Sequence, residues 1–528
     1  MTAAARGTLL VADRVVTLGH GRTEAHAVLV RGKRVVWVGD DPAAAPQHAA
    51  RFELPGCTFG PAFVDAHAHL TMTGLSLTGL DLSQVASGAE LLHTVATYAQ
   101  VHTGRVLWGH GYDDHDFPDA LPSADQLADV TPHCAVYLTR TDSHSCLVDR
   151  HTLAAAPLAR AAGVERDPDG RQTGVLRREA HRIARRWALG AIAEGDLTAA
   201  RETAAGHTAS LGIGCVHEMG GPDIMGTGDF DAWITDRWPV EVIGYWGDLD
   251  LTFIAERELR QAGGDLFLDG SLGSHTAALE APYADAPSEN GLLFHSDDEL
   301  VESFRDATRS GVQVGVHAIG DAAIRQAVRC WQAVNAELPD YLHGEIRRLR
   351  HRLEHAEVLP PNLLAAIAEL GLVASVQPAF EATWGRPGGM YERRLDPARR
   401  EWMNPYRALA DLGVPLAFGS DANVTPMDPW SGVHAAEHRH HRRHELSRLE
   451  AVSASCLGGR YAARQDRVSG VVRAGMRADL AAWEGDPFEA DDPRGARCVL
   501  TIVRGRVTHG DAPLPRWDEE PGDTPLGS

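Results

Sequence analysis

Five short segments of the sequence place metal-ligand side chains directly after apolar, strand-like runs. They cover residues 65–69, 265–269, 316–317, 353–355 and 419–421. Side chains at the carboxyl ends of parallel strands gather at the mouth of a (β/α)8 barrel, where enzymes of this architecture keep their chemistry. Because imidazoles and carboxylates are ligands of catalytic metal ions, the five segments together predict a catalytic metal site.

The pair His67 and His69 is the first part of this prediction. In an extended chain, residues i and i+2 point to the same side, so both imidazoles can reach one ion. Taken alone, a His-x-His pair is a weak signal. His317 and His355 are each typical of hydrogen-bonded structural histidines, and Asp421 is typical of a helix N-cap. The order His-x-His, acidic strand, His, His, Asp, at the ends of predicted strands one, four, five, six and eight, favours the metal site.

Both ends of the chain carry the alternating apolar and polar pattern of short β-strands. The pattern covers residues 8–39 near the N-terminus, and residues 478–483 and 499–508 near the C-terminus. Strand-rich ends around a long α/β middle predict one small β-sandwich domain built from both termini, residues 1–58 and 468–512.

The middle of the chain, residues 59–467, alternates strand-like runs with helical stretches and predicts an α/β fold, a (β/α)8 TIM barrel. Eight runs have the expected character, and they end near Val64, Cys215, Tyr245, Leu268, Val316, Leu353, Val376 and Phe418. Residues 70–205 are largely a predicted insertion after the first strand, suited to a lid or a substrate-binding element. An alternative count places one of the runs at 106–108 or 135–139 in the barrel. Residues 513–528 are predicted to be a disordered tail.

Composition narrows the function classes. The 528-residue chain has a formal charge of −22, which argues against a nucleic-acid-binding surface. No apolar run approaches the ~18 residues of a membrane helix, and the N-terminus runs into a strand-like segment without a secretory signal. The seven cysteines are scattered and lack a CxxC pair. We therefore expect reduced thiols in a cytoplasmic protein that acts on a small molecule, with no nucleic-acid or membrane partner.

Longer motifs around these segments carry a resemblance over nearly the whole chain. They are Pro-Ala-Phe-Val-Asp-Ala-His-Ala-His at 61–69, Arg-Thr-Asp-Ser-His at 140–144, Asp-Gly-Arg-Gln-Thr-Gly-Val-Leu at 169–176, Asp-Gly-Ser-Leu-Gly-Ser-His-Thr-Ala-Ala-Leu at 269–279, His-Ala-Ile-Gly-Asp at 317–321, Arg-Leu-Glu-His at 352–355, Gly-Ser-Asp at 419–421 and Ala-Gly-Met-Arg-Ala-Asp-Leu at 474–480. With these motifs the chain resembles the amidohydrolase superfamily of metal-dependent hydrolases. It is most similar to the amidohydrolase-3 subgroup, which includes N-substituted formamide deformylases. The resemblance implies a barrel with a small β-sandwich, in agreement with the strand patterns.

The resemblance also implies a ligand set. His67, His69 and Asp421 would hold one divalent metal ion, and His317 and His355 a second. A bound metal would activate water for attack on a carbonyl or amidine-like carbon. Asp421, at once ligand and catalytic base, would take the proton and deliver it to the leaving nitrogen.

The strand-four position departs from the pattern of the superfamily. Many members bridge the two ions there with a carboxylated lysine, and Asp265 takes that position here. Lys33 is the only lysine and lies in the terminal β region, so composition excludes a carboxylated lysine. Asp265 can bridge as a shorter carboxylate and act as a metal ligand, or the site holds one ion. Zinc is favoured, and Fe or Mn accept similar ligands. The habit of the family suggests a homodimer.

Seven further residues are candidate substrate contacts, because they follow strand-like runs or lie near the predicted barrel mouth: Trp108, Arg140, Asp142, His144, Asp269, Gln377 and Trp384. The group at 140–144 is equally typical of a buried salt-bridge network, and Trp108 of an ordinary turn and core. The leading prediction is a metal-dependent hydrolase of non-peptide C–N bonds, with amide or N-formyl substrates. The alternatives are a hydrolase of a cyclic amide, a carbamate or an ester, and an inactive scaffold that kept the amidohydrolase fold.

Overall fold

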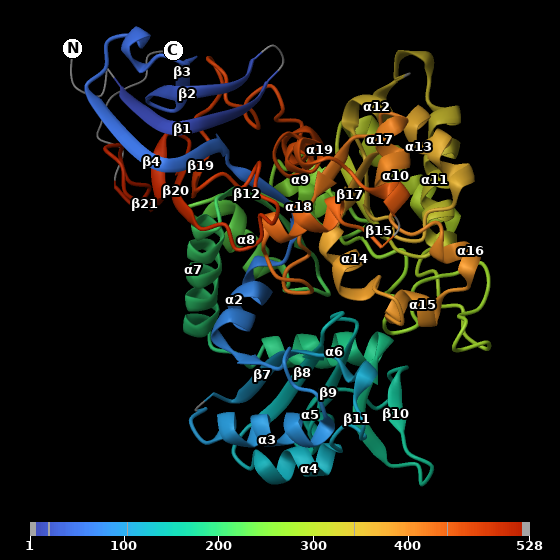
Figure 1. The fold of residues 1–528 in the computed structure, drawn as a ribbon. Coiled ribbons are helices and arrows are strands. Elements are labelled where there is room, and N and C mark those ends of the chain that lie inside the picture. The colour runs from blue at the N-terminus through green and yellow to red at the C-terminus, as the bar shows by residue number, and fades with distance from the viewer. Residues whose placement is uncertain (1–6, 20–21, 103, 343, 441, 520–528) are drawn as a thin grey trace.

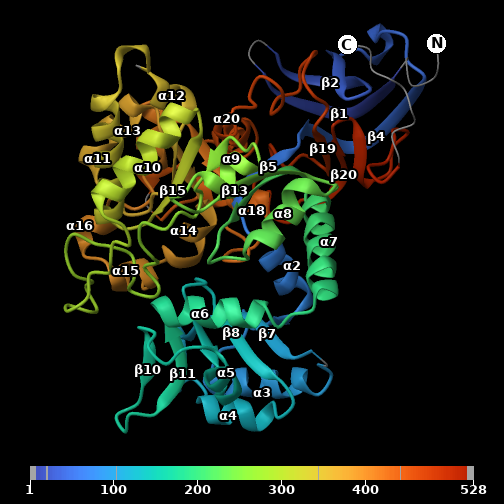
Figure 2. The ribbon, with the colours of Figure 1, turned by 180° about the vertical axis from the view of Figure 1, so that it is seen from behind.

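The computed structural model describes residues 7–19, 22–102, 104–342, 344–440 and 442–519. Figure 1 shows three parts: a sheet near which both ends of the chain lie, a central α/β part, and a separate sheet with its own helices. The view from behind keeps the same arrangement (Figure 2). Within the described residues, no helix combines the length and the apolar character needed to cross a membrane.

The terminal strands form one seven-stranded mixed sheet in the order β21-β20-β19-β4-β1-β2-β3. The strands are β1 (Thr8–Gly19), β2 (Arg22–Arg31), β3 (Arg34–Gly39), β4 (Ala50–Pro61), β19 (Leu480–Glu484), β20 (Cys498–Val503) and β21 (Arg506–Gly510). Apolar side chains from both ends of the chain, such as Leu10, Phe59 and Ile502, pack into one core. The two ends of the chain therefore share a sheet, as their alternating patterns indicate.

The segment that follows β21 is more structured than expected. Residues 513–519 fall in the predicted disordered tail, yet Leu514 packs against the core of the terminal sheet. The amide of Val507 donates to the carbonyl of Pro515 over 2.9 Å. The remaining tail residues, 520–528, lie outside the described part of the chain.

The central part contains two parallel sheets, of three and five strands. The first holds β5 (Phe63–Ala68), β12 (Ile213–Gly220) and β13 (Glu241–Trp246), and the second holds β14 (Gln261–Ala262), β15 (Gln313–Ala318), β16 (Arg352–His355), β17 (Val373–Val376) and β18 (Leu416–Phe418). Seven of the eight predicted runs overlap one of these strands, and the run predicted to end near Leu268 lies beyond the end of β14. At one edge the amide of Gly263 donates to the carbonyl of Trp246 over 2.7 Å, and at another Ala68 pairs in parallel with Ala422. Because all these pairings are parallel, the carboxyl ends of the strands lie on one side.

Helices precede, separate and follow the central strands. They are α7 (Glu194–Ser210), α8 (Thr227–Thr235), α9 (Thr252–Glu256), α10 (Asp297–Ser310), α11 (Asp321–Glu337), α12 (Glu345–Leu349), α13 (Leu364–Leu370), α14 (Pro378–Trp384), α15 (Met390–Arg394), α16 (Pro397–Arg400), α17 (Tyr406–Asp411), α18 (Pro429–Glu437), α19 (Arg448–Ser453) and α20 (Gly459–Ala462). In α10, Ser296 caps the N-terminus through a reciprocal contact with Glu299, and Gly311 ends the helix in the left-handed conformation with φ 71°. Local sequence therefore sets where this helix begins and ends.

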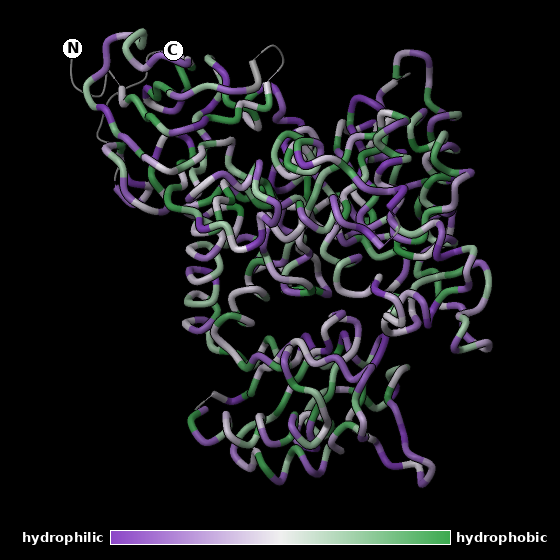
Figure 3. The backbone as a smooth tube through the Cα atoms, in the orientation of Figure 1, coloured by the Kyte–Doolittle hydropathy of each residue, from purple (hydrophilic) through white to green (hydrophobic). Residues whose placement is uncertain are grey.

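The predicted insertion contains a sheet of its own, with six strands in the order β10-β11-β9-β8-β7-β6. Its elements are α2 (Leu70–Thr78), β6 (Leu80–Asp81), α3 (Gly88–Ala99), β7 (Val106–Tyr112), α4 (Ala124–Val130), β8 (Ala135–Arg140), β9 (Ser145–Val148), α5 (Arg150–Ala155), β10 (Val164–Arg166), β11 (Gln172–Arg177) and α6 (Arg178–Leu189). The alternative count is wrong, because β7 and β8 belong to this sheet and not to the central ones. Figure 3 shows hydrophobic strands in this part and a hydrophilic β10–β11 hairpin at its outer end.

Several segments of the insertion contact the central part, and α6 and α2 are two of them. Helix α6 lies on the side of its sheet that faces the central part (Figure 1). Helices α2 and α7 pack side by side, so closely that a Cβ on Gly74 would lie 1.9 Å from the carbonyl oxygen of Ala200. The close packing of α2 on α7 thus fixes the position of the segment that leads into the insertion. Helix α6 faces the ends of the central strands.

Candidate metal centre

The two histidines of the His-x-His pair lie at the end of β5 and are buried. Nδ1 of His67 lies 3.0 Å from Oε2 of Glu354. Nδ1 of His69 lies 2.9 Å from the carbonyl oxygen of Met219. These contacts engage one nitrogen of each ring, so both Nε2 atoms are free to face the centre of the site.

Asp265 lies at the centre of the cluster. Its Oδ1 atom is 3.4 Å from Nε2 of His67 and 3.4 Å from Nδ1 of His317. The same oxygen is 3.6 Å from Nε2 of His355. Its second oxygen, Oδ2, is 3.1 Å from Nε2 of His69. One carboxylate therefore faces three imidazoles with one oxygen and the fourth with the other.

The segment that carries Asp265 is not the regular strand that the sequence predicts. The strand β14 ends at Ala262, because Gly263 and Gly264 follow with φ of 77° and 74° and turn the chain out of the extended conformation. Beyond this turn, Phe267 makes an isolated bridge to β15. The prediction of a strand that continues to Leu268 is thus wrong, and Asp265 lies just after the turn that ends β14.

Asp421 completes the cluster just after β18. Its Oδ1 atom lies 3.2 Å from Nε2 of His69 and 3.6 Å from Nε2 of His67. The backbone of Asp421 has φ 52° and that of His355 has φ 67°, conformations that cost energy for residues with a Cβ. Such strain persists where surrounding structure holds a residue in place, as it does at functional sites.

Five buried ligand-type atoms of this cluster have no hydrogen-bond partner within the described residues. They are Nε2 of His67, Oδ1 of Asp265, Nδ1 of His317, Nε2 of His355 and Oδ1 of Asp421. Buried polar atoms are normally paired, so unpaired atoms that face one another need an explanation. A cation coordinated by these atoms would satisfy them together. In agreement, one ligand atom from each of His67, His69 and Asp421 lies within 4.8 Å of the others, as does one from each of His67, Asp265 and His355.

The carboxylates and imidazoles shift one another's pKa. Burial disfavours the charged form of His69, but Asp265 and Asp421 outweigh burial and raise its pKa to about 10. Burial alone would raise the pKa of Asp265, yet His67 and the other imidazoles hold it well below its usual range. The pKa of Asp421 is lowered in the same way, against burial and mainly by His67. Both carboxylates are therefore ionised and suited to bind a cation.

A second layer of side chains orients the ligands. Arg352 donates to both oxygens of Glu354, over 2.7 and 2.8 Å, and burial of the pair is complete. Despite burial, Arg352 lowers the pKa of Glu354 to about 2, which keeps the carboxylate charged beside His67. Gln377, a predicted substrate contact, instead lies with Oε1 2.9 Å from Nδ1 of His355. Such contacts fix the tautomer and the direction of metal ligands.

Sequence reasoning did not assign Arg352 and Glu354 a role. The signal was available in the strand itself. Two residues apart in β16, their side chains share one face of the strand. His355, the predicted ligand, comes directly after them and turns inward only because its backbone leaves the extended conformation.

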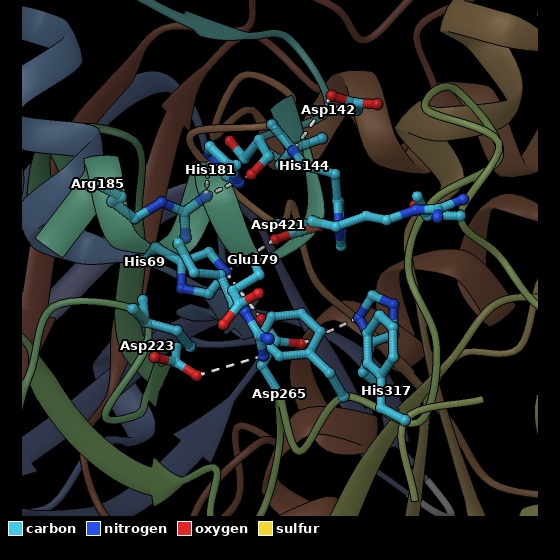
Figure 4. A pocket seen from close by; sticks show the side chains of 18 of the residues that line it. His69, Asp142, His144, Glu179, His181, Arg185, Asp223, Asp265, His317 and Asp421 are labelled. Atoms are coloured by element: carbon cyan, nitrogen blue, oxygen red, sulfur yellow. Dashed lines mark hydrogen bonds and ion pairs between the residues drawn. The ribbon is translucent and has the colours of Figure 1, made fainter. Parts of the chain in front are cut away.

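A cavity of about 290 Å³ opens onto the cluster. Its lining includes His69, Asp265 and Asp421 from the central part. The insertion supplies the facing wall with Asp142, His144, Glu179, His181 and Arg185. Figure 4 shows His144, His181 and Arg185 on one side of the cavity and Asp265 and His317 on the other. The insertion therefore shapes the space above the candidate metal centre.

Four of the predicted substrate contacts lie at this space. Asp142 and His144 line the cavity, and with Arg140 and Trp384 they also line an adjoining cavity of about 40 Å³. Burial, with the nearby charge of His317, lowers the pKa of His144 to about 4, so its imidazole is neutral at neutral pH. The 140–144 group is also a buried ion-pair network, since Arg140 lies 3.3 Å from Asp142.

Two other predicted contacts lie away from the cavities. Asp269 is buried and accepts hydrogen bonds from the amides of Ile319 and Gly320, over 3.0 and 2.8 Å, so it holds the loop after β15. Trp108 packs in the core of the insertion, with its ring centroid 4.5 Å from that of Tyr137. The structure does not bring either side chain to the candidate substrate space.

Two buried acids near the site were not singled out from the sequence. Glu357 lines the smaller cavity, and burial raises its pKa to about 7. Glu218 accepts the amide of Leu70 over 2.7 Å, and burial raises its pKa to about 8. Both lie within or next to apolar runs, where a single acidic residue is itself an unusual signal.

Parallel strands whose ends gather four histidines and two aspartates define a metal-dependent hydrolase of the amidohydrolase type. The model of the amidohydrolase family matches residues 52–509, so the chain belongs to this family. Membership implies a divalent metal, and the buried histidine and carboxylate donors fit one.

Two curated relatives match nearly the whole chain. A putative amidohydrolase, YtcJ of Bacillus subtilis, is 27% identical over 498 residues, which cover 86% of this chain and 90% of the relative. The N-substituted formamide deformylase of Arthrobacter pascens is 23% identical over 95% of this chain and 98% of the relative.

Solved structures agree with the family assignment. An uncharacterised metal-dependent hydrolase of Pyrococcus furiosus has a TM-score of 0.72 and 26% identity, over 91% of this chain and the whole of that chain. A second such hydrolase, from Pyrococcus horikoshii, has a TM-score of 0.73 and 22% identity, over 92% of this chain and 99% of that one. The latter likeness concerns the fold alone.

Proposed function

We propose that this hydrolase cleaves a non-peptide C–N bond of a small molecule, of the amide or N-formyl type. The observation that carries the proposal is the group of five unpaired ligand atoms that face one another beside the cavity. Similarity to a formamide deformylase over 95% of the chain supports the N-formyl type of substrate. In this proposal the two central sheets act as one (β/α)8 barrel, residues 59–467, with 70–205 as a lid. Residues 1–58 and 468–512 form the separate terminal domain.

The proposed metal ligands are His67, His69 and Asp421 for one ion, with His317 and His355 for a second. Asp265 is the proposed shared ligand, because its two oxygens face different imidazoles, 3.1 Å from His69 and 3.4 Å from His317. No lysine is available for a carbamate bridge, since Lys33 lies at the turn between β2 and β3. Zinc suits this donor set, and Fe or Mn accept it.

When bound, a divalent metal supplies Lewis-acid chemistry, polarising a carbonyl group and lowering the pKa of water. Asp421 is the proposed catalytic base as well as a proposed ligand, because its lowered pKa keeps the carboxylate ionised beside the proposed ions. Asp421 accepts the proton of the attacking water and passes it to the leaving nitrogen. The wall formed by α6 covers one side of the cavity, with Arg185 and His181 buried in it.

A second candidate is the hydrolysis of a cyclic amide. An imidazolonepropionase of Cereibacter sphaeroides is 25% identical over 90% of this chain and 92% of the relative. The chemistry at the carbonyl would be the same, and the shape of the cavity would decide between open and cyclic substrates.

The proposed location is the cytoplasm. The seven cysteines are all free of disulfides, which supports a reducing compartment of this kind.

The test is hydrolysis before and after metal removal. Purified protein is treated with a chelator, then reloaded with Zn, Fe or Mn in separate samples, and assayed with N-formylbenzylamine, a cyclic amide, a carbamate and an ester. Chelation is expected to abolish cleavage of the amide, and reloading to restore it. Cleavage that survives complete metal removal, or cleavage of the ester alone, would contradict the proposal.

A further inference from the structure

One buried cation at the cavity lacks an anionic partner. Arg185 lies on α6, lines the cavity and is 7% exposed. Its Nη2 atom donates to the carbonyl of Ser143 and lies 3.3 Å from Nε2 of His181. Its Nε atom is buried without a partner, and no carboxylate of the described residues lies within ion-pair distance.

The other arginines at the two cavities are all paired with carboxylates. Arg140 pairs with Asp113, Asp114 and Asp142, Arg178 with Glu289, and Arg182 with Asp223. A buried guanidinium without a counter-charge is costly, because desolvation of the charge is not offset. The structure tolerates this cost at Arg185, next to a space large enough for a small molecule.

The rim of the same cavity is apolar. Leu292 is 55% exposed and Phe294 is 39% exposed, and both line the cavity together with the buried Ile224. Large apolar side chains that stay exposed at a cavity mouth are suited to cover an apolar group of a ligand. The cavity therefore offers one cationic contact in its wall and an apolar surface at its mouth.

We propose that the substrate is an amide that carries a carboxylate group, which Arg185 binds, and an apolar group, which packs against Leu292 and Phe294. This inference rests on the proposed function and names its substrate class. Guanidinium and carboxylate match in shape and charge, so such a contact adds affinity and fixes orientation. In this proposal Arg185 is a specificity-determining residue of the insertion. Arg140 does not have this role, because it is already paired with three carboxylates of the protein.

Two matched amides test the inference on the metal-loaded enzyme. N-acetylphenylalanine and N-acetylphenethylamine differ only in the carboxylate. The wild-type enzyme is expected to prefer the carboxylate by at least about tenfold in kcat/KM, a typical value for a charge-assisted contact. Arg185→Gln should remove the preference mainly through KM, and Arg185→Lys should retain part of it. The control is Arg186→Gln on the same helix, an exposed arginine that pairs with Asp223 and does not line the cavity.

Binding separates this inference from the proposed reaction. The ketones 2-benzyl-4-oxopentanoate and 5-phenylpentan-2-one replace the amide nitrogen by carbon and cannot be hydrolysed. Calorimetry on the metal-loaded enzyme should show tighter binding of the first, with the difference lost in Arg185→Gln. If this holds but neither amide is cleaved, the proposed reaction fails and the carboxylate site stands.

Two outcomes would overturn the carboxylate site. The first is equal binding of both ketones to the wild-type enzyme, even if the amides are cleaved. The second is an equal loss of affinity for both ketones in Arg185→Gln, which would mean that Arg185 only holds the backbone at Ser143.

Discussion

Ser420 donates its hydroxyl to Oδ2 of Asp65 over 2.5 Å and its amide to Oδ1 of the same carboxylate over 2.9 Å. These bonds join the segment after β18 to β5 at the point where each bears a proposed ligand. The amide of Asp421 also donates to the carbonyl of His67 over 2.8 Å. The relative position of His67 and Asp421, two proposed ligands far apart in the chain, therefore depends on the hydrogen bonds between Ser420 and Asp65.

Ser420→Ala should weaken metal binding without removing a ligand. The carboxylate of Asp65 would lose a buried donor, at a cost of about 1–3 kcal/mol in the free energy of unfolding. Loss of an outer contact that orients ligands typically lowers metal affinity by about 10–100-fold. Competition with a chromophoric chelator measures the affinity. Ser76→Ala, which removes a hydroxyl bonded within α2, is the control and should leave it unchanged. Equal affinity in both variants would count against a role for Ser420.

Asp265→Ala should change the metal content of the purified protein. If Asp265 is shared between two ions, the wild-type protein should hold about two equivalents and the variant about one or fewer, because the shared carboxylate is lost. Elemental analysis of the protein after dialysis measures the content. Asp236→Ala removes an exposed carboxylate after α8 and serves as the control. A wild-type content of one equivalent, unchanged in the variant, would show that Asp265 is not a shared ligand.

Glu241 should make the free energy of unfolding depend on pH in the acid range. Burial alone would raise its pKa, but Arg460, Arg477 and Arg504 hold it well below the usual range. Because the folded-state pKa lies below the unfolded value, near 4.3, the stabilisation is present above that pH and is lost as the pH falls. At pH ~7, Glu241→Gln should lower the free energy of unfolding by about 3 kcal/mol.

The difference in the free energy of unfolding between the wild-type protein and Glu241→Gln should become smaller as the pH falls from about 5 to about 3. Urea unfolding at several pH values measures it. Glu484→Gln, which breaks an exposed pair with Arg497, should change stability by less than about 1 kcal/mol at any pH. A pH-independent difference for Glu241→Gln would contradict the proposed ionisation.

The two predicted tryptophan contacts should behave differently. Trp384 lines the smaller cavity, so Trp384→Ala should raise KM several-fold or more. Trp108 lies in the core of the insertion, so Trp108→Ala should cost about 3–5 kcal/mol in stability. Steady-state kinetics below the unfolding temperature separates the two effects. A raised KM for Trp108→Ala with unchanged stability would place Trp108 at the substrate after all.

The sequence predicts which histidine and aspartate side chains gather in one cluster better than it predicts the cavity beside that cluster. His67 and His69 could be placed because alternation along one strand is a local rule, and Asp421 because it ends an apolar run. The strand at Asp265 was misjudged, since two glycines end β14 before the acidic residues. The roles of Arg185 and Glu354 are not predicted, because they depend on contacts between residues far apart in the chain. Arg185 reaches the cavity only through the packing of a separate sheet, which no local pattern encodes.

The single lysine has a practical consequence for chemical labelling. Lys33 lies at the turn between β2 and β3, in the terminal sheet. The cavity is lined by residues of the central part and of α6, and α6 lies apart from the terminal sheet (Figure 1). Amine-reactive dyes, cross-linkers and surface-coupling reagents can therefore attach to no side chain of this sequence other than that of Lys33. A fluorophore or a biosensor tether at Lys33 would leave the mouth of the cavity open, so the wild-type chain can be immobilised for binding measurements without engineering.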